Sequence, residues 1–318
     1  MARYGVASRR SQVRPSLQKR VVRLSVFLLF LLCAVSVGIS ASVGWVFTHP
    51  VRNAIVGSPA AAGLSYENVE FPSRRGDVTL SGWFLPGRPG GRTVIFAHGY
   101  GSNRWGEHPF APMATVLVQH GFNVLTFDFR AQGRSSGSLI TLGQYEQYDV
   151  LGAVDYLQRR FGYQVPIGIL GCSMGAATAL LAAANSRQIR AVVSDSAFAD
   201  LTAYLSAHMT VWTHLPSFPF TPLILWETPL LTGADPHAVS PIAAVRTLTH
   251  TPVLFIQGTA DSLIPYDNSK QLYQAMAGRQ RDLWLVQRAD HVGSVLVAPQ
   301  AYEQKVLTFF RRYLPSGS

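Results

Sequence analysis

The stretch that decides the fold is ILGCSMGAAT, which runs from Ile169 to Thr178. It places Ser173 between Gly171 and Gly175, after the apolar segment VPIGILG and before the helical pattern MGAATALLAAANS. A serine at so sharp a strand-to-helix turn needs glycines beside it, because a Cβ there would collide with neighbouring backbone. The N–H groups of the following helix stabilise negative charge. The stretch therefore predicts a nucleophile that attacks a carbonyl carbon, and a simple helix cap is the alternative.

A nucleophilic serine needs a base to remove its proton. His291, in LVQRADHVGS, follows the last predicted strand, and Asp261, in LFIQGTADSLIP, follows the strand before it. The carboxyl ends of parallel strands meet at one edge of a sheet, so Ser173, Asp261 and His291 can converge there. Asp195, which follows the strand IRAVVSD, is a second carboxylate that could serve the imidazole. We favour Asp261 and expect Asp195 to form local hydrogen bonds.

The rest of the chain alternates between short apolar segments and segments with helical spacing of apolar residues. YENVEF and VTLSGWFL predict an antiparallel hairpin that enters a sheet. The alternation that follows predicts an α/β fold with a mostly parallel, doubly wound sheet covered on both faces. The predicted buried strands are TVIFAHG, FNVLTFDF, VPIGILG, IRAVVSD, TPVLFIQG and DLWLVQ.

The N-terminal region predicts a membrane anchor. The segment Leu24–Phe47 carries no charge, and as a helix it would be roughly 36 Å long, enough to cross a bilayer. No acid lies among the seven cations before it, and only Arg52 is basic in the stretch after it. The positive-inside rule then puts the N-terminus in the cytoplasm and the rest of the chain outside. The seven cations are Arg3, Arg9, Arg10, Arg14, Lys19, Arg20 and Arg23.

Two other interpretations of this segment remain open. Ser40-Ala41-Ser42 resembles a signal-peptide cleavage site, so the protein could be secreted after cleavage. A buried core helix is the other alternative, which the preceding cations disfavour. Of the formal net charge of +10, those seven cations leave +3 (10 − 7) for the remaining chain, which argues against a nucleic-acid partner.

These observations predict four parts of the chain. We expect a basic cytoplasmic tail at 1–23, a transmembrane anchor at 24–47, a linker at 48–64 and a catalytic domain at 65–318. Within that domain, an insertion at about 200–245 is rich in proline and aromatic residues, and we interpret it as a lid over the site. The candidate substrate-binding residues in the lid are Trp212, Phe218, Phe220 and Trp226.

The lid allows two further interpretations. Its apolar residues could simply bury one another, or the lid could touch the membrane beside the anchor. Elsewhere, His98 is expected to pack beneath a loop of the site, Asp128 to pair with Arg130, and Cys172 to fill space as a small buried residue. The histidines and acids show no compact ligand spacing, so no metal site is predicted.

With these residues in view, the sequence resembles the α/β-hydrolase family over about residues 66 to 314. HGYGSN, at 98–103, looks like the family's loop after the third strand, which implies that the N–H groups of Tyr100 and Met174 form an oxyanion hole. DFRAQGRSSG, at 128–137, is similar to a family loop but has Ala131 where glycine is usual. The basic anchor and the motifs look most like the Bem46 and ABHD13-type membrane-anchored serine hydrolases.

The sequence thus predicts a membrane-anchored serine hydrolase that cleaves an ester or thioester of a hydrophobic or acyl substrate through an acyl-enzyme, without a cofactor. The expected partners are a small lipid-like substrate and the membrane. A serine peptidase of the same fold is the alternative within enzymes. A catalytically silent, membrane-tethered binding scaffold is the alternative from another class.

Overall fold

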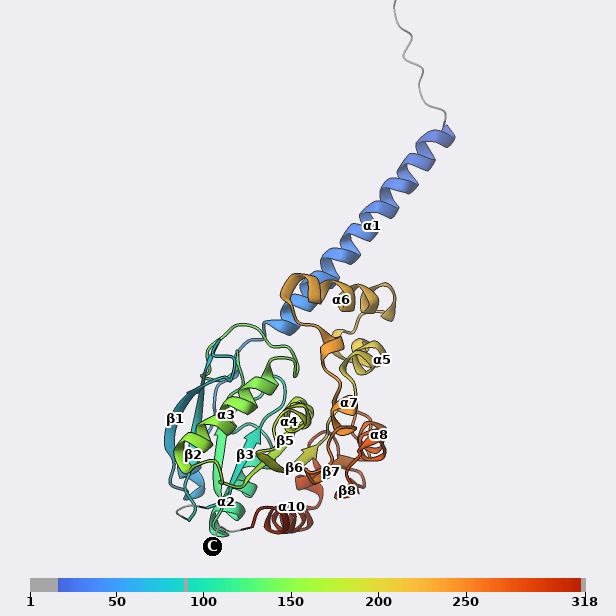
Figure 1. Ribbon diagram of the computed structural model, residues 1–318. Coiled ribbons are helices and arrows are strands. Elements are labelled where there is room, and N and C mark those ends of the chain that lie inside the picture. Colours follow the sequence, from blue (N-terminus) through green and yellow to red (C-terminus); the bar gives the residue numbers. More distant parts are fainter. Residues whose placement is uncertain (1–16, 89–90, 316–318) are drawn as a thin grey trace, which may run out of the picture.

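The computed structural model describes residues 17–88 and 91–315, so residues 1–16 of the predicted tail lie outside the described residues. One eight-stranded sheet has helices on both faces, and the long helix α1 projects away from it (Figure 1). The order of the strands is β1-β2-β4-β3-β5-β6-β7-β8. The strands are β1 (Glu67–Pro72), β2 (Thr79–Leu85), β3 (Thr93–Ala97), β4 (Asn123–Phe127), β5 (Ile167–Cys172), β6 (Ile189–Asp195), β7 (Val253–Gly258) and β8 (Arg281–Val286).

The sheet confirms the predicted architecture. Strand β1 pairs with β2, and β2 with β4, in antiparallel orientation, while the pairs from β4 through β8 are parallel. Successive residues of the central strands alternate between two cores, as strands covered on both faces require. For example, Ile169 packs in one core and Leu170 in the other.

Two sets of helices bury these cores. Helices α3 (Glu146–Phe161), α4 (Met174–Ala184) and α8 (Asp267–Ala275) contribute to one core. Helices α2 (Phe110–Gln119) and α10 (Pro299–Tyr313) contribute to the other. A short helix, α9 (Ser294–Val297), follows β8 and precedes α10. The carboxyl ends of the parallel strands are thereby left for the functional loops.

The segment between β6 and β7 forms the excursion that the sequence predicts as a lid. Helix α5 (Leu201–Thr213) begins at Asp200, whose carboxylate accepts a hydrogen bond from the Ala203 N–H at 3.0 Å. Helix α6 (Ser217–Thr232) lies across the base of α1 in Figure 1. A 3-10 turn, η2 (Pro236–Ala238), and helix α7 (Pro241–Val245) return the chain to β7. A further 3-10 turn, η1 (Pro59–Ala62), precedes β1.

Helix α1 (Leu17–Thr48) is the one helix among residues 17–88 and 91–315 that is long and apolar enough to cross a membrane. A signal sequence near an N-terminus would meet the same criteria. The helix packs against α6, and its buried residues recur at every fourth position, which places them on one face. These residues are Ser36, Ser40, Gly44 and Thr48. The side chain of Arg52 then holds the chain to the domain by donating to the carbonyl oxygen of Gly137 at 2.6 Å.

The loop after β4 corrects one prediction. Asp128 and Arg130 do not pair with each other, because each has a different buried partner. Asp128 accepts from the Arg104 guanidinium at 2.6 Å, and Arg130 donates to Asp149 at 2.7 Å. Ala131, where the resembled family has glycine, adopts a φ of 58°, the left-handed conformation that glycine adopts without strain.

Candidate active site

Ser173 lies on the sharp turn between β5 and α4. Its φ of 54° and ψ of −121° are strained for a residue with a Cβ. The flanking glycines permit this turn: a Cβ on Gly171 would lie 2.6 Å from the Gly175 carbonyl oxygen, and one on Gly175 would lie 2.1 Å from the Ala97 carbonyl oxygen. Because both contacts are with backbone, no side-chain movement would relieve them. The serine side chain is therefore presented at the sheet edge, and it lines a cavity there.

Three side chains from three loops form a continuous chain of hydrogen bonds at this edge. The His291 Nε2 lies 2.9 Å from the Ser173 Oγ, and the His291 Nδ1 lies 2.9 Å from the Asp261 Oδ2. Asp261 is itself held by its loop, since its Oδ1 accepts from the N–H groups of Leu263 and Ile264 at 3.0 and 2.8 Å. This order of serine, imidazole and carboxylate is the arrangement that activates a hydroxyl for attack.

Asp195 lies at the end of β6 but contacts neither ring nitrogen of His291. Its carboxylate accepts from the Tyr302 hydroxyl and from the Ser196 hydroxyl, each at 2.9 Å. Burial raises the pKa of Asp195 to about 6, and those two hydrogen bonds act against the rise. Asp195 thus forms local hydrogen bonds beneath the site, while its backbone carbonyl accepts from the Ser173 N–H at 2.8 Å.

The charges around His291 favour its protonated form. Burial alone would lower the pKa of His291, but the hydrogen bond and the negative charge of Asp261 outweigh burial and raise the pKa above the ordinary 6.5. Asp195 and Glu107 add smaller contributions in the same direction. An imidazolium formed during proton transfer from Ser173 is stabilised by the same carboxylates.

The predicted oxyanion groups lie on two segments that meet at Ser173. Met174 begins α4, and Tyr100 follows Gly99, at which a Cβ would lie 3.2 Å from the Ser173 Cβ. Neither the Tyr100 N–H nor the Met174 N–H donates a hydrogen bond to another described residue. Glu107, which no sequence motif singles out, holds this loop by accepting from the Gly99 N–H at 2.8 Å. Both amides are therefore available to a ligand beside the serine.

His98 and Cys172 occupy buried positions beneath the site. The His98 Nδ1 donates to the Gly99 carbonyl at 2.8 Å and its Nε2 accepts from the Phe129 N–H at 3.0 Å, so both ring nitrogens serve the loop. Burial lowers the pKa of His98, which keeps the ring neutral. Cys172 is fully buried, and burial raises the pKa of its thiol, which suits a small apolar filler.

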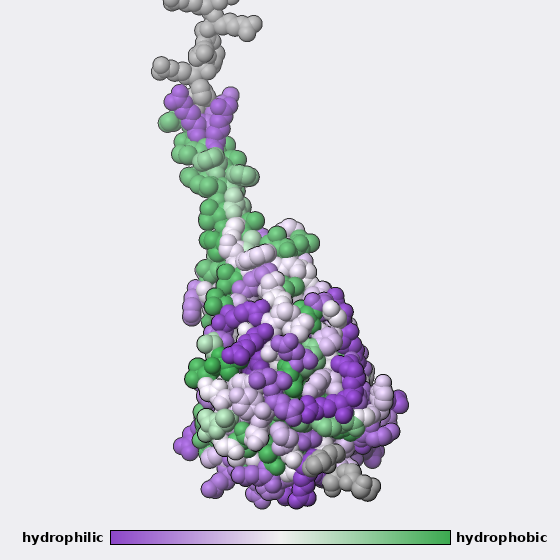
Figure 2. Space-filling model, turned by 90° about the vertical axis from the view of Figure 1, so that its left-hand side faces the viewer, coloured by the Kyte–Doolittle hydropathy of each residue, from purple (hydrophilic) through white to green (hydrophobic). Residues whose placement is uncertain are grey.

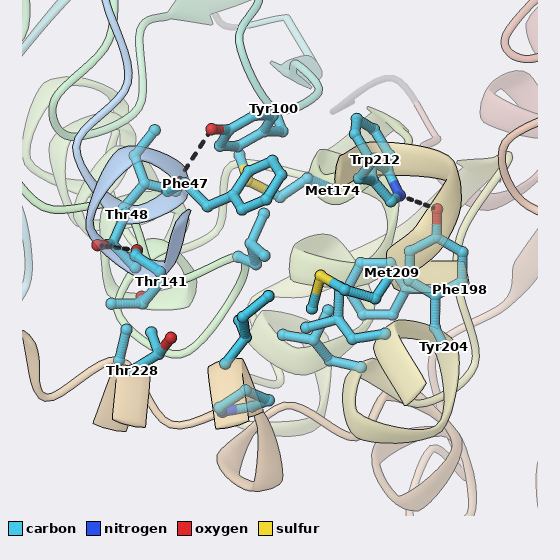
Figure 3. A pocket seen from close by; sticks show the side chains of 18 of the residues that line it. Phe47, Thr48, Tyr100, Thr141, Met174, Phe198, Tyr204, Met209, Trp212 and Thr228 are labelled. Atoms are coloured by element: carbon cyan, nitrogen blue, oxygen red, sulfur yellow. Dashed lines mark hydrogen bonds between the residues drawn. The ribbon is translucent and has the colours of Figure 1, made fainter. Parts of the chain in front are cut away.

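A cavity opens above Ser173 and encloses about 890 Å³, its open mouth included. Its walls are almost entirely apolar and come from the lid, the Tyr100 loop and α1 (Figure 3). Tyr204 and Trp212 of α5 fix one wall, where the Trp212 Nε1 donates to the Tyr204 hydroxyl at 2.8 Å.

The predicted lid residues divide into one that lines the cavity and three that do not. Trp212 lines it, but Phe218, Phe220 and Trp226 are absent from its walls. Helix α6 instead turns Ile224, Leu225 and Thr228 to the cavity, which leaves Phe218 and Trp226 81% and 64% exposed. The prediction selected large aromatic residues, whereas the face that the helix buries depends on what it packs against.

Helix α1 contributes to the cavity, which sequence reasoning missed. Gly44, Phe47 and Thr48 line it, and the Tyr100 hydroxyl donates to the Phe47 carbonyl at 3.0 Å (Figure 3). Burial raises the pKa of Tyr100 to about 12, so the phenol stays a donor. The available signal was the recurrence of Ser36, Ser40 and Gly44 at every fourth position, but Gly38, Ala41 and Ser42 lie among them, so the sequence does not single out this face.

No group of three or more His, Cys, Asp or Glu residues that could hold a metal occurs in the part of the chain that the structure describes. The chemistry open to the arrangement is nucleophilic attack by Ser173 with proton transfer through His291.

Comparisons with known proteins agree with this fold. A family model described as alpha/beta hydrolase fold matches residues 92–208. The uncharacterized protein YfhR of Escherichia coli K12 is 30% identical over 237 residues, which cover 72% of this chain and 74% of that protein. The esterase Pf2001 of Pyrococcus furiosus superposes with a TM-score of 0.71 at 29% identity, covering 84% of this chain and 98% of that one. The lysophosphatidylserine lipase ABHD12 of Danio rerio is 27% identical over 190 residues, 58% of this chain and 47% of that protein.

Proposed function

The chain belongs to the α/β-hydrolase family, and we propose that it is a membrane-anchored serine hydrolase that cleaves esters or thioesters with an apolar acyl group. The observation that carries the proposal is the hydrogen-bonded order Ser173–His291–Asp261, whose serine lines an apolar cavity. The similarity to an esterase and to a lipase supports hydrolysis. The resemblance to the Bem46 and ABHD13-type group supports the combination of hydrolase and anchor.

The geometry supports a two-step reaction. As the Ser173 Oγ attacks the carbonyl carbon, its proton passes to the His291 Nε2, and Asp261 stabilises the imidazolium. The carbonyl oxygen becomes an oxyanion that accepts hydrogen bonds from the Tyr100 and Met174 N–H groups. His291 then gives its proton to the leaving alkoxide or thiolate, which leaves an acyl group on Ser173. Water, deprotonated by His291, attacks this acyl-enzyme and releases the acid and free Ser173.

The cavity supports an apolar substrate, because no charged side chain among the described residues lines it. The acyl chain would contact the apolar side chains of α5 and α6, and Trp212 would be a binding residue. A cationic amine would find no carboxylate among the described residues that form these walls, which disfavours the peptidase alternative. A binding scaffold would not need a strained serine that is hydrogen-bonded to an imidazole.

The packing of α1 supports a retained anchor over a cleaved signal peptide. The small-residue site Ser40-Ala41-Ser42 lies within the helix, and Ser40 is fully buried where α1 packs on the domain. A signal peptidase needs an accessible, extended segment, whereas this one is helical and partly covered. The cations that precede Leu24 support a cytoplasmic N-terminus and an extracytoplasmic hydrolase domain.

A fluorophosphonate probe tests the enzymatic proposal. We expect the probe to label the full-length protein and to leave Ser173→Ala unlabelled. Ser206→Ala is the matched control, because Ser206 is an exposed lid serine whose hydroxyl only donates to the Thr202 carbonyl. Labelling of Ser173→Ala at the wild-type rate would move the nucleophile elsewhere.

Protease added outside intact cells or spheroplasts tests the topology. We expect digestion of the hydrolase domain and protection of an N-terminal fragment. A protected domain would contradict the orientation. A shorter soluble product that begins near Ser42 would contradict the retained anchor.

A further inference from the structure

We propose that α6 lies within the bilayer leaflet next to the hydrolase domain, and that a membrane-resident ester enters the cavity from this leaflet where α1 meets α6. The substrate class is a lipid-like ester whose apolar chain remains in the bilayer until it binds. The position of α6 rests on the proposed membrane anchor, and the entry route rests in addition on the proposed hydrolase function.

The depth of α6 follows from the position of charge along α1. Arg23 is the last charged residue of the helix, and Arg52, the next in the chain, is bound to the domain. A hydrocarbon core of about 30 Å takes up roughly 20 helical residues at about 1.5 Å each. Counted from Leu24, the core ends near residue 43. Ser36 and Ser40 therefore lie in the half of the bilayer nearest the domain, and Gly44 lies at its boundary.

Helix α6 covers α1 at this depth. Ser36, Ser40 and Gly44 are among the few buried residues of α1, and a Cβ on Gly44 would lie 2.3 Å from the Thr228 Oγ1 of α6. Small residues let two helices approach closely, which is how helices pack within membranes. A helix packed along this part of α1 must share its depth, so α6 lies inside the leaflet.

The outer face of α6 suits lipid chains. Figure 2 shows apolar side chains covering α1 between its basic end and the domain, and the exposed residues of α6 continue this apolar surface. Glu227 is the only charged residue of α6, and it is 5% exposed. In water such a face would be costly, whereas against acyl chains it is favourable. Its large exposed side chains are Phe218, Trp226, Leu230 and Leu231.

Helices α1 and α6 both contribute residues to the wall of the cavity that holds the nucleophile. Gly44, Phe47 and Thr48 of α1 and Ile224, Leu225 and Thr228 of α6 line the cavity that holds Ser173. By the same count Gly44 lies at the boundary of the hydrocarbon core and Phe47 and Thr48 lie just outside it, so an acyl chain in the leaflet ends next to the cavity wall.

Several buried polar groups at this contact also lack a hydrogen-bond partner. The Ser40 Oγ, the Thr228 Oγ1 and both carboxylate oxygens of Glu227 are buried without a hydrogen-bond partner among the described residues. A contact that leaves polar groups unpaired costs less to open than one whose groups are all bonded. Separation of α1 from α6 is therefore a feasible route for an acyl chain.

The position of α6 is tested by fluorescence quenching. The full-length protein with Cys33→Ser and Leu230→Cys is labelled with an environment-sensitive fluorophore and reconstituted in phosphatidylcholine vesicles that contain lipids brominated on their acyl chains. Tyr163→Cys is the control, because Tyr163 is 75% exposed beyond the end of α3. Cys172 is buried and should not react. We expect strong quenching at residue 230 and none at residue 163. Equal, weak quenching at both would overturn the placement of α6.

The entry route is tested with two esters in the same vesicles: a water-soluble short-chain nitrophenyl ester and a long-chain fluorogenic ester dissolved in the bilayer. Leu230→Asp puts a charge on the lipid-facing side of α6, outside the cavity, and Tyr163→Asp is the control. We expect Leu230→Asp to lower kcat/KM for the bilayer ester at least ~10-fold and to leave the soluble ester within ~2-fold. Unchanged hydrolysis of the bilayer ester would refute lateral entry. If the wild type hydrolyses neither ester, the hydrolase function fails instead, and the quenching result still decides where α6 lies.

Discussion

Replacement of Asp261 by asparagine tests which carboxylate serves His291. In the native site Asp261 accepts four hydrogen bonds, from His291, from the Gln257 amide and from two backbone N–H groups. Asparagine can keep the two backbone bonds through its oxygen. Its NH₂ group must then face His291 and the Gln257 amide, which are both donors.

The expected loss follows from that geometry. To avoid two donors face to face, the neutral imidazole takes the tautomer in which Nδ1 accepts and Nε2 carries the proton. The Nε2–H then points at the Ser173 hydroxyl and cannot remove its proton. We expect kcat to fall by roughly 10⁴, which corresponds to about 5.5 kcal/mol of lost transition-state stabilisation.

Asp195→Asn is the matched control, since it changes the other buried carboxylate of the site. Its partners are the hydroxyls of Tyr302 and Ser196, and a hydroxyl can accept from an amide as readily as it donates to a carboxylate. We therefore expect a loss in kcat of less than ~10-fold. The assay is hydrolysis of a short-chain nitrophenyl ester, with thermal unfolding to check that both variants fold. A larger loss in Asp195→Asn than in Asp261→Asn would refute the assignment.

The remaining predictions concern the nucleophile, its base and two backbone positions. Ser173→Ala should fold normally and lose ester hydrolysis by ~10⁴ to 10⁶; substantial residual turnover would argue against Ser173. Because only neutral His291 accepts a proton and its pKa is raised, kcat/KM should fall with decreasing pH through a midpoint above 6.5, and a midpoint below 6.5 would contradict this. In Gly175→Ala the added Cβ would lie 2.1 Å from a backbone oxygen, so this variant should lower the free energy of unfolding by at least ~2 kcal/mol. In Gly162→Ala the added Cβ would have no described atom within 4 Å, and the φ of 88° alone should lower the free energy of unfolding by only ~1 kcal/mol. Ala131→Gly should raise the free energy of unfolding by at most ~1 kcal/mol, and thermal unfolding measures this change.

The parts that the sequence could predict are those governed by local geometry. The glycines around Ser173 constrain the backbone at that point, and the order of strands places Ser173, Asp261 and His291 at one edge whatever the surrounding side chains do. The alternation of apolar segments likewise determines the layering of the sheet. These features depend on few contacts between residues that are far apart in the sequence.

The parts that could not be predicted depend on tertiary partners. Arg104 pairs with Asp128 across 24 positions, and nothing near either residue indicates that choice over the neighbouring Arg130. Helix α6 is apolar on nearly every side, so its sequence does not specify which face turns to the cavity. The small-residue face of α1 can be recognised as a packing surface only once α6 is seen against it.

Because Gly44, Phe47 and Thr48 form part of the cavity wall, α1 is not an interchangeable tether. An ordinary single-pass anchor can be exchanged for any apolar segment of equal length, and its sequence drifts freely under selection for hydropathy alone. If α1 is the proposed anchor, two kinds of selection act on opposite sides of one helix. The side that faces lipid should tolerate leucine, valine or phenylalanine at random, whereas the side that carries Ser36, Ser40 and Gly44 should admit only small residues. A chimera that carries a foreign apolar segment in place of α1 would lose the part of the cavity wall that Gly44, Phe47 and Thr48 form.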